Sequence, residues 1–143
     1  MKKVKVITAL LAISIFVSLS ASAQHRQEWL KSNTPVFVEL AKEVVSEDCV
    51  VGQDIDFKVC KPVLSENNVE LIHAGAKAVG RVKRLTKYEM EIEVTFVESI
   101  SGRDIRVEGG YLLAKRTRQQ CCVIFEMGKR TTASVQSNTQ ITL

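Results

Sequence analysis

Strict alternation of apolar and polar residues is the feature that most restricts how this chain can fold. It is clearest over residues 88–96, where apolar residues alternate with three glutamates and a threonine. Successive side chains of a β-strand point to opposite faces of a sheet. The pattern therefore predicts a half-buried strand whose core face carries Met90, Ile92, Val94 and Phe96.

The same alternation recurs along most of the chain after Pro35. Further strands are expected at 36–40, 55–59, 69–72, 76–82, 105–107, 121–127, 131–135 and 140–143. A turn at 101–104 makes a hairpin of the strands on either side of it, and Gly80 predicts a bulge or a close backbone approach. About eight or nine short strands without a long amphipathic helix predict an all-β fold, a small closed or partly open antiparallel β-barrel or sandwich.

The first 23 residues have the order of a cleavable secretory signal peptide. Lys2, Lys3 and Lys5 precede an apolar run over 6–19, and small residues at 21–23 supply the cleavage site. The apolar run is shorter than the roughly 20 residues of a membrane-spanning helix. We therefore expect a periplasmic or secreted protein with no stable membrane span after cleavage.

Removing that segment leaves a nearly neutral single domain. The segment holds three of the 20 Lys and Arg and none of the 16 Asp and Glu, so 17 basic residues face 16 acidic ones, a formal charge of +1. We expect an N-terminal extension over 24–34, with one short helical turn that lays Trp29 against the domain, and a β-barrel-like domain over 35–143. Near-neutral charge and an aromatic content of 6% exclude nucleic acid as an expected partner.

Four cysteines, Cys49, Cys60, Cys121 and Cys122, are disulfide candidates in an oxidising compartment. The preferred bridge joins Cys49 to Cys60, which flank one expected strand, and the alternative joins Cys60 to Cys121 or Cys122. Adjacent cysteines on a strand point to opposite faces, so one of the last two is expected to be buried or bridged and the other free. Paired Cys-x-x-Cys motifs are missing from the sequence, so neither a metal site nor a cofactor is expected.

Two groups of residues bear on catalysis, and neither predicts an enzyme. Glu89, Glu91 and Glu93 are the residue type that glycoside hydrolysis requires, but their alternation is typical of a solvated sheet face. Their expected cross-strand partners are Arg81, Lys83, Arg103 or Arg106. His73 stands in a turn beside Ala74-Gly75, where an imidazole is expected to form surface hydrogen bonds.

A compact basic cluster follows the apolar residues 111–113. Its cations are Lys115, Arg116 and Arg118. Such a cluster attracts anionic lipid head groups, cell-wall phosphates or an acidic partner, and otherwise keeps a loop solvated. These three residues are the predicted partner contact, with an envelope protein or a cell-wall component as the partner.

The order of strands and turns resembles a known envelope domain. Thr34-Pro35 opens the first strand, the residues Val51-Gly52-Gln53-Asp54 turn into the second, and Ile72-His73-Ala74-Gly75 leads to a Gly-x-Val strand that ends at Val82. With the hairpin over 90–107, this order is similar to the periplasmic β-barrel domain of scaffold proteins of type IV secretion and conjugation systems. The resemblance covers roughly residues 34–110.

That resemblance implies a non-enzymatic, extracytoplasmic β-barrel module. We accordingly expect a structural or interaction module in the bacterial envelope. A small-ligand binding β-barrel is the first alternative. A hydrolase with a site that the motifs do not reveal is the second.

Overall fold

A computed structural model describes residues 26–143 of the chain, so the signal peptide expected over 1–23 lies outside the described residues. The described part is all-β, which confirms the predicted fold class. Its strands are β1 (Gln27–Leu30), β2 (Pro35–Leu40), β3 (Val44–Val45), β4 (Asp54–Val59), β5 (Val63–Leu64), β6 (Glu70–Ile72), β7 (Lys77–Leu85), β8 (Glu89–Glu98), β9 (Asp104–Glu108), β10 (Tyr111–Lys115), β11 (Ile124–Phe125), β12 (Arg130–Val135) and β13 (Thr139–Thr142). One 3-10 helix, η1 (Ser46–Asp48), follows β3.

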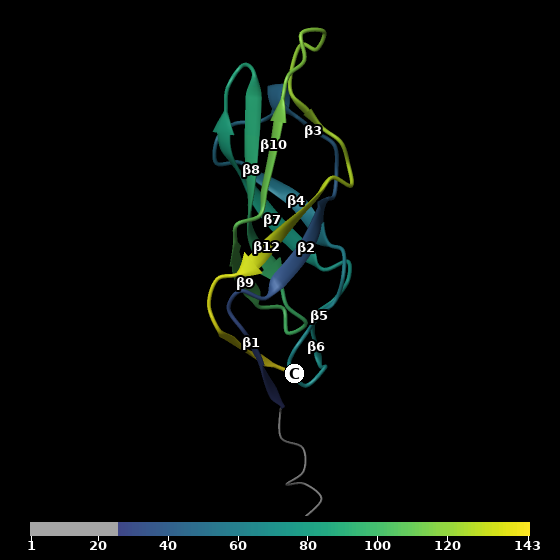
Figure 1. Cartoon of the computed structure of the whole chain (residues 1–143), viewed down its shortest axis with the longest axis vertical. Helices are drawn as coiled ribbons and strands as arrows, with labels where there is room; N and C mark the ends of the chain where they lie inside the picture. The colour runs from purple at the N-terminus through teal and green to yellow at the C-terminus, as the bar shows by residue number, and fades with distance from the viewer. Residues whose placement is uncertain (1–25) are drawn as a thin grey trace, which may run out of the picture.

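Six antiparallel strands close a barrel in the order β8, β7, β4, β2, β12, β9 and back to β8 (Figure 1). Closure depends on the length of β8, whose first part pairs with β10 and whose last part pairs with β9. The chain passes from β9 to β10 at Gly109 and Gly110. A Cβ on Gly110 would stand 2.9 Å from the Ala133 Cβ of β12. Only glycine therefore lets the connection between β9 and β10 approach β12 so closely.

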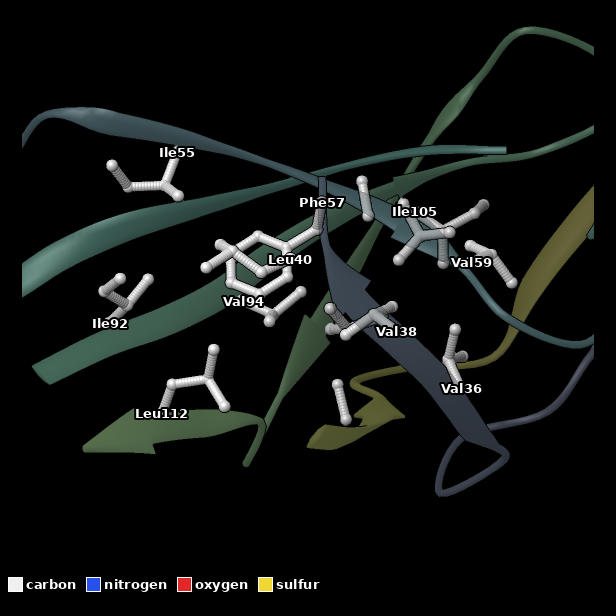
Figure 2. Close-up of a cluster of buried hydrophobic side chains, with 14 of the residues drawn as sticks. Val36, Val38, Leu40, Ile55, Phe57, Val59, Ile92, Val94, Ile105 and Leu112 are labelled. Carbon is white, nitrogen blue, oxygen red and sulfur yellow. The ribbon is translucent and has the colours of Figure 1, made fainter. Parts of the chain in front are cut away.

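Apolar side chains from all six strands fill the inside of the barrel (Figure 2). Alternate residues of β2 and β4 point inward as the sequence predicts, and so do Met90, Ile92 and Val94 of β8 and the expected residues of β9. The labelled members in Figure 2 are Val36, Val38, Leu40, Ile55, Phe57, Val59, Ile92, Val94, Ile105 and Leu112. Burial of this apolar surface is the main stabilising contribution to such a fold.

The bulge predicted at Gly80 is confirmed, and it changes one core assignment. Val79 pairs with Phe96 but Gly80 pairs with Val94, so Thr95 is an extra residue in β8. One extra residue exchanges the two faces of a strand beyond it. The prediction that Phe96 faces the core is therefore wrong: Val97 is buried instead, and Arg106 lies over the Phe96 ring, 5.6 Å from its centroid.

The expected helical turn around Trp29 is also wrong. Residues Gln27–Leu30 form β1, which pairs with β13 near the end of the chain. Leu30 enters the core from this strand, whereas the Trp29 side chain points outward and is 54% exposed. The strand expected at 121–127 is limited to β11, and a bend precedes it. Between residues 26 and 143 there is no helix with the length and apolar character needed to cross a membrane.

Candidate functional site

The predicted partner-contact residues gather at one end of the long axis of the molecule. Lys115 ends β10, and the loop that carries Arg116 and Arg118 projects beyond the barrel next to the turn between β7 and β8 (Figure 1). Tyr88, in that turn, accepts a hydrogen bond at its carbonyl from the Arg116 N–H, at 2.7 Å. Lys87 completes the group, which we call the basic end: Lys87, Tyr88, Lys115, Arg116 and Arg118.

Tyr88 lies at the centre of the basic end. Its side chain is 62% exposed, and the Arg116 guanidinium carbon lies 5.0 Å from its ring centroid. Lys87 Nζ lies 6.0 Å from the same centroid. A cation over an aromatic face is attracted by the ring quadrupole, so the ring positions both cations without neutralising them.

The cations of the basic end have no acidic partner among the described residues. None of the ion pairs there includes Lys87, Lys115, Arg116 or Arg118. Glu89 is opposite Lys115 in the sheet register, but its carboxylate pairs with Arg84 instead. The positive charge at this end is therefore available to an external anion.

The glutamate row on β8 is the solvated, ion-paired face that the alternation predicts. Arg84 Nη2 lies 3.0 Å from Glu89 Oε1, and Arg84 Nε lies 3.7 Å from Glu91 Oε2. Lys83 Nζ lies 3.3 Å from Glu93 Oε2, and the hydrogen bond with that carboxylate raises the pKa of Lys83. Lys83 was among the predicted partners, whereas Arg84 was not. Arg81 pairs with Asp54 instead.

His73 lies at the edge of an open cleft of about 560 Å³ between the turn before β7 and the turn after β8. Its Nδ1 lies 3.1 Å from Glu70 Oε2, and the imidazole is largely exposed, as predicted for a surface histidine. Ser99 and Ser101 share the cleft, and their hydroxyls lie 2.9 Å apart. Over residues 26–143 no hydrogen bond joins the imidazole to either serine.

The four cysteines are free thiols in this structure. The preferred bridge between Cys49 and Cys60 is not formed. Burial is the main factor that raises the pKa of both thiols. The alternative bridge from Cys60 to the later pair is not formed either.

Cys121 and Cys122 differ in burial as predicted, but they do not point to opposite faces. Cys121 is exposed and Cys122 is buried, while their sulfur atoms lie only 3.3 Å apart. They approach because they occupy a bend rather than a strand. A hydrogen bond with Cys121, burial and the charges of Cys121, Glu47 and Asp48 raise the pKa of Cys122 to about 11.

Glu47 of η1 lies beside these two cysteines. One of its carboxylate oxygens and the two sulfurs all lie within 4.8 Å of one another. Ser46 holds the two segments together: its N–H donates to the Val123 carbonyl and its Oγ accepts from the Val123 N–H, each at 2.9 Å. The sequence does not reveal this cluster, because nothing in the local pattern links residue 47 to residues 121 and 122.

No protein-family model matches the chain, and a search of curated proteins finds no match either.

Proposed function

We propose that this protein is an exported, non-enzymatic β-barrel module of the bacterial envelope that binds an acidic partner protein through its basic end. The observation that carries the proposal is a set of cations that have no acidic partner within residues 26–143, arranged around the exposed Tyr88. The N-terminal sequence supports export. The order of strands and turns supports the envelope setting, because the type IV scaffold domain it resembles is also a β-barrel.

The chemistry of the basic end favours a carboxylate-bearing protein surface. Arg116 is already oriented by its backbone hydrogen bond to Tyr88 and by contact with the ring, so little side-chain freedom is lost on binding. Arginine and tyrosine are enriched at protein interfaces. Guanidinium groups bind carboxylates in a bidentate manner, and this geometry supports an acidic protein segment as the ligand.

A small ligand inside the barrel is the weaker proposal. The largest side chains of the interior, including Phe57 and Leu40, are nearly fully buried and occupy the space that such a ligand would need (Figure 2). A hydrolase is the second alternative, and its active site would lie in the open cleft beside His73. The imidazole there contacts Glu70 rather than a serine, which supports a non-enzymatic role.

Charge reversal tests the proposal with a short poly-glutamate peptide as the probe. The variant K115E/R116E/R118E should lose binding, and binding by the wild type should weaken as salt is raised because exposed charges are screened. The control K61E/K77E/R103E makes the same change in net charge at exposed positions outside the basic end and should keep binding. Equal binding by both triple variants would overturn the proposal.

The native partner can be sought with the same pair of variants. Cross-linking in intact cells should recover an acidic envelope protein with the wild type and with the control, but not with the basic-end variant. Recovery of cell-wall polymer in place of a protein would contradict the choice of partner.

A further inference from the structure

We propose that Glu47, Cys121 and Cys122 form a binding site for a Zn²⁺ ion, with a water molecule as the fourth ligand. This site shares no residue with the basic end and does not depend on the proposed function. It joins η1 to the loop between β10 and β11, two segments far apart in the sequence.

The separations between the ligand atoms suit a tetrahedral ion. Two thiolates at the usual Zn–S distance of about 2.3 Å in a tetrahedron stand roughly 3.8 Å apart. The two sulfurs here are 3.3 Å apart, so they need to open by only about half an ångström. The carboxylate oxygen already lies within 4.8 Å of both sulfurs, a distance that a rotation of the exposed Glu47 side chain can shorten.

The ligand types select zinc over other common ions. Mg²⁺ and Ca²⁺ prefer sites made wholly of oxygen atoms, whereas two sulfurs and one carboxylate suit a borderline ion. A linear two-coordinate ion such as Cu⁺ needs its sulfurs on opposite sides. Neighbouring cysteines with sulfurs 3.3 Å apart do not provide that arrangement.

The surrounding hydrogen bonds hold the two segments that carry the ligands side by side before any ion binds. Ser46 exchanges two hydrogen bonds with Val123, which is fully buried, and β3 pairs with β11 directly beside them. Glu47 and its neighbour Asp48 are both acidic residues of η1, and their negative charge makes this surface favourable for a cation. A site that is already assembled loses less entropy on binding.

Co²⁺ serves as the spectroscopic probe, because its bonds to thiolates give an ultraviolet charge-transfer band. The exported protein, purified with its thiols reduced, should show this band with one equivalent of Co²⁺. One equivalent of Zn²⁺ should then abolish the band. Absence of the band in the wild type would overturn the proposal.

Variants separate this site from the other thiols and carboxylates. C121S and C122S should lose the charge-transfer band, and E47Q should bind at least about tenfold more weakly, the usual order of effect for loss of one supporting group. The controls C60S and E43Q should bind like the wild type, since neither residue belongs to the cluster. An unchanged band in C121S, or equal affinity in E47Q, would contradict the three-ligand site.

Hydrogen exchange supplies a second measurement of zinc binding that does not depend on absorbance. Zn²⁺ should slow amide exchange over residues 116–123, because the ion would join this loop to η1. The effect should be absent in C121S. Because Cys121 is exposed, this substitution should leave the fold intact. Slower exchange in both proteins would show that zinc acts elsewhere.

Discussion

Phe57 of β4 lies against the backbone of Gly80 in β7, so closely that a Cβ on Gly80 would stand 2.5 Å from Phe57 Cε2. The same Cβ would meet the Glu93 carbonyl oxygen at 3.0 Å. The packing of the Phe57 ring in the core therefore depends on a strand position that has no side chain. This contact sits beside the bulge that moves Phe96 to the outside.

The variant G80A is expected to destabilise the protein by about 1–3 kcal/mol, because overpacking shifts side chains and backbone. Urea unfolding measures the change. The double variant G80A/F57L should be less destabilised than the sum of the two single variants, because the shorter side chain removes the main clash. Strict additivity would show that the ring and the glycine do not interact in this way.

Glu39 on β2 should make stability depend on pH in the acid range. Its carboxylate lies 3.2 Å from Lys58 Nζ and 3.4 Å from Arg130 Nε, and the hydrogen bond with Lys58 is the main factor that lowers its pKa. A lowered pKa in the folded state contributes stability above the ordinary pKa of glutamate, and this contribution is lost as pH falls through the folded value.

The variant E39Q should therefore have a lower urea midpoint than the wild type at pH 7. The gap should close as the pH falls below the usual range of a glutamate. E43Q, which alters an exposed glutamate outside the ion pairs of the described residues, is the control and should follow the wild type. A gap that stays constant with pH would mean that the charge of Glu39 is not responsible.

Tyr88 should contribute to binding but not to stability. Because its ring is exposed, Y88A should change the free energy of unfolding by no more than about 0.5 kcal/mol. Loss of the surface under Arg116 should still weaken poly-glutamate binding several-fold, as expected for about 1 kcal/mol of cation–π interaction.

The matched control is Y111A. Tyr111 is also exposed and also contacts a cation, with Lys83 Nζ 4.8 Å from its ring centroid, but it lies outside the basic end. Peptide binding by Y111A should equal that of the wild type. If both tyrosine variants bind equally, Tyr88 is not part of the contact surface.

In the zinc-free protein the cysteines should react with iodoacetamide in the order of their exposure. Cys121 should be alkylated first and Cys122 last, because Cys122 is buried and its pKa of about 11 keeps it protonated at neutral pH. Timed alkylation followed by peptide mass spectrometry measures the order. A peptide pair linking Cys49 to Cys60 in the non-reduced exported protein would contradict the free state of these two thiols.

Much of the barrel could be predicted because alternation directly reports which face of a strand is buried. Met90, Ile92 and Val94 enter the core as expected, and so do Ile105 and Val107. The pattern could not show that Thr95 is an extra residue, because a shift in register depends on the partner strand. The sequence around Trp29 is polar and short, and only pairing with β13 makes it a strand.

The two candidate sites differ in how far the sequence could predict them. The basic cluster was visible because its members are neighbours in sequence, and Arg116 and Arg118 indeed lie on one loop. The sequence could not show that Tyr88 belongs to the basic end, because it is the turn between β7 and β8 that brings Tyr88 next to Arg116. Glu47 meets Cys121 only through the pairing of β3 with β11, a contact between distant segments that composition and spacing do not encode.

The pairing of β1 with β13 brings Gln27 and Thr142 together at one pole of the molecule, while the loop that follows β10 lies at the other (Figure 1). A fluorescent protein or an affinity tag fused after Leu143 would therefore sit a full molecular length from the basic loop. Reporter fusions at that terminus can follow partner capture in living cells without covering the surface under study. Attachment of the chain to a support by the same end would likewise present Arg118 outward.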